Sequence, residues 1–534
     1  MLIATTEYGP VKGARKSSFA GRGYLSYQGI PYMKPPVGKL RFREAQLPDK
    51  WTEPFDATKD PPAYVNVNYL TNVLEGQEDA GIINVYRPDI ATKPLPTMVW
   101  IHGGGFTSGS SRTDLFGPDY FMQKDVVLLT FNYRLGVIGF LSLKDPELNI
   151  PGNAGLKDQV LALKWVKNNI ASFGGDPNNI TLLGQSAGGA STHLHMLSDQ
   201  SKNLFNRAIL MSGLAFNKVW AFAPQLNWAE RLAKELGFTG NGENEVLQFL
   251  ENANASDLMM ATNHLYTGEE SNGLHLLFAF GAVVEPYVNE KTFIPTDPVV
   301  MARSAWSSEL DCIMGYASFD GLGVPIEDSS ELVGTMQGNL AYFAPFELKL
   351  DNYSEQAKRV GKKIKENYFG KLELSKTCLE PFAHFHSDLF TIHGVDRVAK
   401  SRAAHGNGKT FMYRFNADTD LNVCKRKLLK KGQFPGAAHC DDLFYMFATE
   451  YDSPPQLDSK EHALIERSTG LWTSFAINGV PTSVETQWKP LEASSEAPVL
   501  LDISNEGLKM FSQPEFERIQ VWNEVFNEVG VDLY

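Results

Sequence analysis

The chain has 534 residues, of which 43% are hydrophobic and 21% charged, as expected for a globular protein with a large buried core. Its net charge of −13 is spread along the sequence and no basic stretch alternates with aromatic residues, so nucleic-acid partners are not expected. No linker, charge block or repeat interrupts the pattern, and we predict a single domain over residues 1–534.

The N-terminal region predicts short hairpins, because turn residues separate half-apolar runs at 6–10, 11–15 and 24–29. The first residues lack the basic start and long apolar core of a signal peptide. The longest apolar run, 276–284, is too short to cross a bilayer. We therefore expect neither secretion nor a membrane span.

The middle of the chain alternates buried strands with helical patterns, which predicts a mostly parallel sheet covered on both faces. The predicted strands are 97–101, 126–131, 180–183 and 207–211. Between the second and third strands, apolar residues recur every three or four positions and predict an amphipathic helix over 156–173.

The remaining elements lie on the C-terminal side of these strands. A polar helical pattern over 225–272 predicts lid and wall helices over the mouth of a site. The last elements predicted are a helix at 464–478, a strand at 499–503 and a helix at 515–529.

Residues 184–188, Gly-Gln-Ser-Ala-Gly, join the strand at 180–183 to a small-residue helix. This pattern is typical of a nucleophile elbow, in which glycines allow close backbone contact around a strained serine. A second motif, His-Gly-Gly-Gly-Phe at 102–106, directly follows the strand at 97–101. Successive glycines can turn backbone N–H groups toward one point, as an oxyanion hole requires.

Further motifs occur in order along the chain: Gln-Gly-Ile-Pro-Tyr (28–32), Glu-Asp (78–79), Asn-Tyr-Arg (132–134), Gly-Asn-Ala-Gly (152–155) and Phe-Gly-Gly-Asp-Pro (173–177). With these motifs the chain resembles the type B, cholinesterase-like carboxylesterases almost end to end, and is most similar to intracellular insect detoxifying esterases. The resemblance implies an α/β-hydrolase fold, with a large, mostly parallel central sheet, helices on both faces and an N-terminal hairpin region.

A serine needs a histidine to accept its proton and a carboxylate to orient that histidine. On this fold both follow the serine, in the order acid, then histidine. Residues 436–442 match the family signature G-x-x-H-x-x-[D/E], which indicates His439 as the partner of Ser186. The alternatives His384, His386 and His393 lie in a helical stretch without a turn signature.

The acid is predicted from the family pattern G-x-x-x-x-[E/D]-G, which residues 315–321 match with Asp320. Most relatives have glutamate here, and the shorter aspartate reaches the imidazole only if its loop shifts slightly. Glu327, without a flanking glycine, is the competing candidate.

The resemblance also assigns supporting residues. It implies that the N–H groups of Gly104, Gly105 and Ala187 form the oxyanion hole, and that Ser212 hydrogen-bonds the buried acid. Trp220 is expected in the wall of the substrate pocket, although an ordinary core role is equally compatible with a tryptophan. The resemblance also implies two buried ion pairs, Arg41 with Glu78 and Arg134 with Asp158.

The four cysteines, at 312, 378, 424 and 440, lack the spacing of a metal site. Secreted relatives carry a cysteine after the Glu-Asp pair, where this chain has Ala80. We therefore expect free thiols and a cytoplasmic protein.

The sequence predicts a serine carboxylesterase that hydrolyses xenobiotic or lipid-like esters through an acyl-enzyme, without cofactor or metal. Its expected partners are small-molecule esters and organophosphate or carbamate inhibitors. We expect organophosphates to be bound or sequestered, as in detoxification and insecticide resistance. Two alternatives remain open: a juvenile hormone esterase, favoured by Gln185, and a non-catalytic binding member of the family.

Overall fold

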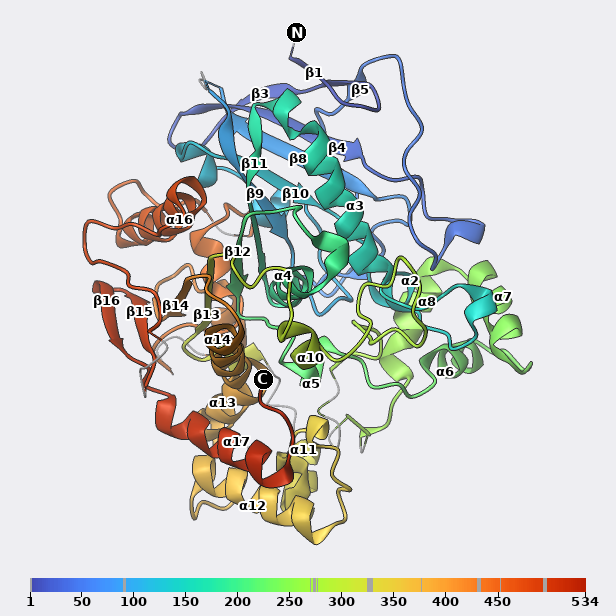
Figure 1. The fold of residues 1–534 in the computed structure, drawn as a ribbon, viewed down its shortest axis with the longest axis vertical. Coiled ribbons are helices and arrows are strands. Elements are labelled where there is room, and N and C mark those ends of the chain that lie inside the picture. The colour runs from blue at the N-terminus through green and yellow to red at the C-terminus, as the bar shows by residue number, and fades with distance from the viewer. Residues whose placement is uncertain are drawn as a thin grey trace.

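The computed structural model describes residues 2–89, 93–268, 270–271, 275, 277–323, 330–375, 377–429, 434–451, 453–492 and 497–534. Figure 1 shows a central twisted sheet, with the N-terminal strands at the top of the molecule, strands β15 and β16 at the left, and helices α12 and α17 at the bottom. The chain therefore builds its sheet progressively from one end of the molecule to the other.

The central sheet has eleven strands in the order β16-β15-β14-β13-β12-β11-β9-β10-β8-β4-β3. The strands from β10 to β15 pair in parallel, and both edges are antiparallel. The bounds are β3 Ala14–Ser17, β4 Gly23–Pro31, β8 Ile82–Pro88, β9 Leu95–Ile101, β10 Val127–Phe131, β11 Gly175–Gln185, β12 Arg207–Met211, β13 Cys312–Ala317, β14 Thr410–Phe415, β15 Val499–Ser504 and β16 Gly507–Ser512. This topology confirms the predicted fold class.

Smaller strands and the helices complete the fold. The small sheets contain β1 Ile3–Thr5, β2 Pro10–Lys12 and β5 Phe55–Asp56, and β6 Asn66–Val67 and β7 Leu74–Glu75. The helices are α1 Thr113–Phe116, α2 Gly136–Phe140, α3 Ala154–Asn169, α4 Ala187–Leu197, α5 Lys218–Ala221, α6 Trp228–Glu235, α7 Glu243–Asn252, α8 Ala255–Ala261, α10 Pro298–Ala302, α11 Ser330–Gly338, α12 Glu355–Phe369, α13 Leu379–Ser387, α14 His393–His405, α15 Val423–Leu428, α16 Lys460–Asn478 and α17 Phe516–Val529.

Strand β9 shows why the sheet is covered on both faces. Val99 and Ile101 pack in a core cluster with α3 and α4, whereas Met98 and Trp100 pack in a second cluster with α16. Alternate residues of a strand point to opposite faces, so an uninterrupted apolar run requires helices on both sides. In Figure 1, α3 and α16 lie on opposite sides of the central strands.

Strand β11 departs furthest from its predicted bounds. β11 begins at Gly175 rather than at residue 180, because its register with β9 shifts between Gly175 and Ile180. The predicted turn at 176–179 is therefore an irregularity inside the strand, where the Asn178 N–H donates to Asp176 Oδ1 at 2.8 Å.

Both predicted ion pairs are present. Arg134 and Asp158 are fully buried and joined by two bonds of 2.7 and 2.6 Å, and Arg41 binds Glu78 at 2.7 and 2.6 Å. A third arginine nitrogen in each case binds backbone carbonyls, so these pairs fix loops to the body of the fold. Within the described part of the chain, no helix is long and apolar enough to cross a membrane.

Candidate active site

Ser186 lies at the sharp turn between β11 and α4. Its backbone is left-handed, with φ 57° and ψ −124°, which is strained for a residue with a side chain. Its N–H donates to the Met211 carbonyl at 2.8 Å. A Cβ on Gly213 would lie 1.9 Å from the Ser186 carbonyl oxygen, so only glycine allows this close contact. The turn thus holds the hydroxyl at the carboxyl end of the sheet.

Ser186, His439 and Asp320 are joined in one hydrogen-bonded chain. His439 Nε2 lies 2.9 Å from Ser186 Oγ, and His439 Nδ1 lies 2.5 Å from Asp320 Oδ1. The other Asp320 oxygen accepts from the Ala317 N–H at 3.0 Å. In this arrangement the imidazole can accept the serine proton while the carboxylate fixes its tautomer.

The charges around His439 favour its protonated form. Burial lowers the pKa of His439, but the Asp320 carboxylate, with smaller contributions from Asp442 and Asp441, raises it above its ordinary value. The proton that the imidazole accepts in a reaction is therefore stabilised by the site itself.

Asp442 is a further carboxyl at the site that the sequence analysis used only as part of a signature. It is buried, and neither of its carboxyl oxygens has a hydrogen-bond partner in the described structure. Burial, with the nearby negative charge of Asp320, raises the pKa of Asp442 to about 7. Its ionised form is therefore unfavourable in the folded protein.

We expect Asp442→Asn to stabilise the protein more at pH 8 than at pH 5. A carboxyl with a raised folded-state pKa binds a proton that the unfolded chain has lost, so its contribution to stability disappears as pH rises from about 4 to about 7. The asparagine carries no charge to bury, and the difference in apparent Tm between variant and wild type should grow between the two pH values. Exposed Asp458→Asn is the control, and an equal Tm difference at both pH values would contradict the expectation.

The glycine loop after β9 passes beside the nucleophile. Gly104 and Gly105 have φ values of 105° and 61°, and a Cβ on Gly103 would lie 3.0 Å from the Ser186 Cβ. No described group accepts a hydrogen bond from the Gly104 or Gly105 N–H. Ala187 begins α4, so its N–H has no acceptor within the helix. These three donors are available to a substrate oxygen.

The three side chains open into a cavity of about 300 Å³ with mainly apolar walls. Trp220 lies in this wall, as predicted, and its Nε1 donates to the Phe390 carbonyl at 2.7 Å. Phe390 and Thr391 come from a π-helical turn, Asp388–Ile392, and Leu277 and Phe278 complete much of the wall. Sequence patterns gave no signal for these wall residues.

The predicted hydrogen bond between Ser212 and Asp320 is not formed. Ser212 Oγ is buried without a partner in the described structure, and both Asp320 oxygens bind other groups. Ser212 instead has a left-handed backbone at φ 48° and donates its N–H to Gly315. Its backbone, rather than its hydroxyl, contacts strand β13, which precedes Asp320 in the chain.

The other histidine candidates do not reach the site. His386 and His393 are buried elsewhere, where His393 contacts Asn523, and none of the three alternatives lines the cavity. His102 stacks on Tyr133 at 4.5 Å and contacts the Gly103 carbonyl, so it shapes the glycine loop. The competing acid, Glu327, lies outside the described residues.

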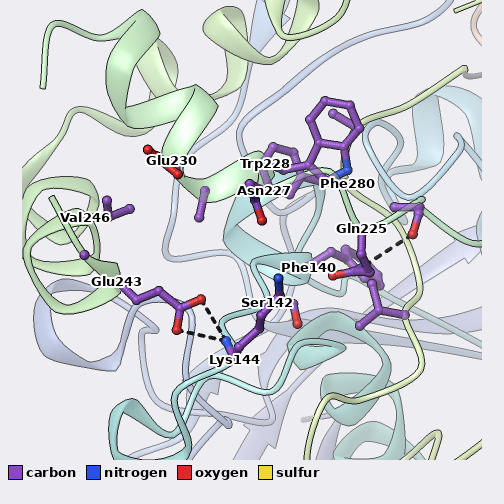
Figure 2. A pocket seen from close by; sticks show the side chains of 15 residues that line it. Phe140, Ser142, Lys144, Gln225, Asn227, Trp228, Glu230, Glu243, Val246 and Phe280 are labelled. Carbon is purple, nitrogen blue, oxygen red and sulfur yellow. Dashed lines mark hydrogen bonds between the residues drawn. The ribbon is translucent and has the colours of Figure 1, made fainter. Parts of the chain in front are cut away.

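A second cavity, of about 240 Å³, lies beside α6 and α7 (Figure 2). Trp228, Phe280 and Phe140 line it, and Glu243 at its edge accepts hydrogen bonds from the Lys144 and Asp145 N–H groups. The helices predicted over 225–272 border this cavity, and no described residue of that segment lines the catalytic one. Within the described residues these helices therefore line the second cavity and not the one at Ser186, and their predicted role as a lid stays a prediction.

No group of three or more His, Cys, Asp or Glu side chains among the described residues could hold a metal ion. The cavity at Ser186 is also lined by His439, Asp320 and the glycines 103–105.

Comparison with known proteins gives consistent results. The model of the "Carboxylesterase family" matches residues 1–522. Esterase B1 of Culex pipiens is 37% identical, with 98% of each chain covered, and a juvenile hormone esterase of Tribolium castaneum is 34% identical, with 90% of this chain and 84% of the relative covered. The crystal structure of juvenile hormone esterase from Manduca sexta, with OTFP covalently attached, superposes with a TM-score of 0.87 at 29% identity, covering 98% and 99% of the two chains.

Proposed function

The chain belongs to the carboxylesterase family and hydrolyses carboxylic esters, and we propose that it does so through an acyl-enzyme on Ser186. The observation that carries this proposal is the continuous hydrogen-bonded chain from Ser186 Oγ through His439 to the buried carboxyl of Asp320. A serine in this environment is an activated nucleophile.

In the first half of the reaction, Ser186 Oγ attacks the ester carbonyl carbon while His439 Nε2 takes the hydroxyl proton. Asp320 stabilises the imidazolium through Nδ1. The carbonyl oxygen becomes an oxyanion, which the N–H groups of Gly104, Gly105 and Ala187 stabilise by hydrogen bonds. The tetrahedral intermediate then expels the alcohol, which leaves with the proton from His439 Nε2.

In the second half, the acyl group remains on Ser186 and water takes the place of the alcohol. His439 accepts a proton from this water while the water oxygen attacks the acyl carbonyl carbon. This attack forms a second oxyanion. The intermediate releases the carboxylic acid, and the proton returns to Ser186 Oγ. The same base and the same donors therefore serve both steps.

The substrates that fit this cavity best are apolar esters of xenobiotic or lipid-like type. Trp220, Leu277, Phe278 and Phe390 give the wall its apolar character, and an acyl or alcohol group gains free energy by leaving water there. Organophosphates can phosphylate the same serine, and carbamates can acylate it. A phosphylated serine is expected to hydrolyse slowly, because the site is built for planar acyl chemistry.

We expect a burst of nitrophenol when the protein meets a short nitrophenyl carboxylate, followed by steady turnover. With a nitrophenyl dialkyl phosphate the burst should be followed by almost no turnover. Rapid mixing measures both phases, and a fluorophosphonate probe followed by mass spectrometry should find Ser186 as the labelled residue. Labelling at another residue, or turnover of carboxylates without any labelling, would contradict the acyl-enzyme proposal.

Juvenile hormone esterase is a second candidate. Two comparisons favour it: relatives of that name and the overall superposition on one of them. Comparing kcat/KM for juvenile hormone, a methyl ester, with kcat/KM for naphthyl esters of increasing acyl length separates the two candidates. A clear preference for the naphthyl series would favour the broader enzyme.

A cytoplasmic location stays a prediction. It is supported by the four free cysteines and by the buried Ala80 at the position where secreted relatives carry a cysteine. Cell fractionation tests it, and recovery of the protein with secretory vesicles would contradict it.

A further inference from the structure

Two free thiols lie together at the rim of the catalytic cavity. Cys440 directly follows His439 and lines the cavity, and its thiol lies near that of Cys424, the second residue of α15, whose N–H donates to Asp441 Oδ1 at 2.9 Å. Both are partly exposed, and neither is in a disulfide. The pair therefore combines two neighbouring thiols with access from solvent, which most cysteine pairs in a core lack.

Asp441 fixes the two segments that carry these thiols. Its Oδ1 accepts from the Cys424 and Lys425 N–H groups at 2.9 and 3.2 Å, and its Oδ2 accepts from the Ala438 N–H at 2.8 Å. Lys425 Nζ adds a bond of 2.7 Å to the Gly436 carbonyl. These bonds hold the start of α15 against the histidine loop, so the two sulfur atoms stay close without being bonded.

The pair is connected to the catalytic base by two short routes. Cys440 is the chain neighbour of His439 and has a left-handed backbone at φ 71°. Its thiol donates to Gln185 Oε1 at 3.4 Å, and Gln185 Nε2 lies 3.3 Å from His439 Nε2. A change at the Cys440 sulfur therefore alters a contact of the base and the backbone that positions it.

We propose that Cys424 and Cys440 are a reversible oxidation site, at which a hydroperoxide closes a disulfide and thereby lowers esterase activity. The inference rests on the proposed function only for its activity readout, since the disulfide is detected independently by mass.

The chemistry needs one hydroperoxide, ROOH, for each disulfide. The neighbouring Cys424 thiol and burial raise the pKa of the Cys440 thiol well above its ordinary value, so Cys440 stays protonated at neutral pH. The Cys424 sulfur attacks the peroxide and gives up its proton, the O–O bond breaks, and ROH leaves with that proton, giving a sulfenic acid. The Cys440 sulfur then displaces the hydroxyl group as water, which takes up its proton, and an S–S bond forms.

Forming the S–S bond removes the thiol proton that Cys440 donates to Gln185. It also brings the two sulfur atoms to the bonded separation of about 2 Å, which pulls the loop after His439 toward α15. A misplacement of the catalytic base by about 1 Å can lower the rate about a hundredfold. We therefore expect a fall in kcat rather than a change in KM alone.

The experiment compares wild type with Cys424→Ser and, as matched control, Cys378→Ser, which removes a thiol outside the cavity. Each protein is treated with cumene hydroperoxide, quenched with an alkylating agent and divided for esterase assay and peptide mass spectrometry. For wild type and the control we expect a Cys424–Cys440 peptide, a loss of about tenfold or more in kcat, and recovery with dithiothreitol. Cys424→Ser should keep its activity through the same treatment.

Three outcomes would overturn the proposal. Wild type could lose activity without forming the Cys424–Cys440 peptide, it could form the peptide without losing activity, or Cys424→Ser could be inactivated as strongly as wild type. If untreated wild type does not hydrolyse esters at all, the proposed function fails instead, and the peptide readout still decides whether the oxidation site exists.

Discussion

Replacing Ser186 with alanine is expected to lower kcat/KM for ester hydrolysis by more than about a thousandfold, because the change removes the nucleophile itself. The fold should remain, since the substitution deletes one hydroxyl and leaves the surrounding turn and its backbone hydrogen bonds in place. Steady-state kinetics with a nitrophenyl ester measure the loss, and circular dichroism checks the fold.

Ser212→Ala is the matched control for this variant. Ser212 also lies at a left-handed turn after a strand next to the elbow, but its hydroxyl has no hydrogen-bond partner in the described structure. We expect its kcat/KM to stay within a few fold of wild type. Residual activity of Ser186→Ala above about a thousandth of wild type would count against the assignment of the nucleophile.

Asp320→Asn is expected to lower kcat by about four orders of magnitude, as the histidine loses its tautomer and its orientation. The loss is large because Asp320 Oδ1 binds His439 Nδ1, and the side chain of Asp320 is fully buried. KM should change much less, because Asp320 acts through His439 and not on the ester.

Asp320→Glu and Glu327→Gln are the controls for the acid. Glutamate keeps the charge and is the usual residue of relatives, so Asp320→Glu should retain far more activity than Asp320→Asn. Glu327→Gln should be near normal. A crippled Glu327→Gln beside a nearly active Asp320→Asn would move the acid to position 327.

The sheet could be predicted from the sequence because its central strands are uniformly apolar. Strand β12 has the predicted bounds, Arg207–Met211, and β9 and β10 differ only at their starts. A strand that is buried on both faces is apolar throughout, so it can be recognised in the sequence without knowledge of the elements that pack against it. The bend inside β11 was less visible, since Pro177 and Asn178 normally end a strand and here the register shift accommodates them.

That Ser186, Asp320 and His439 meet in one hydrogen-bonded chain was predictable, because each lies in a short motif with its own backbone requirement. The walls of the cavity were not, because Leu277, Phe390 and Trp220 come from segments far apart in sequence. Their meeting depends on tertiary packing, which no local pattern encodes. Ser212 shows the opposite error, since a motif implied a hydroxyl contact that the local geometry does not make.

The strained backbone at Ser186 bears on how this protein can evolve. A side chain held in such a region costs about 1 to 3 kcal/mol, which glycine would avoid. On the proposed function, the serine is therefore kept against the protein's own stability, and natural selection for hydrolysis maintains it. In a lineage released from that selection, replacing the serine would make the protein more stable. Genetic drift and this gain in stability would both favour early loss of the serine, while the buried sheet beneath it persists.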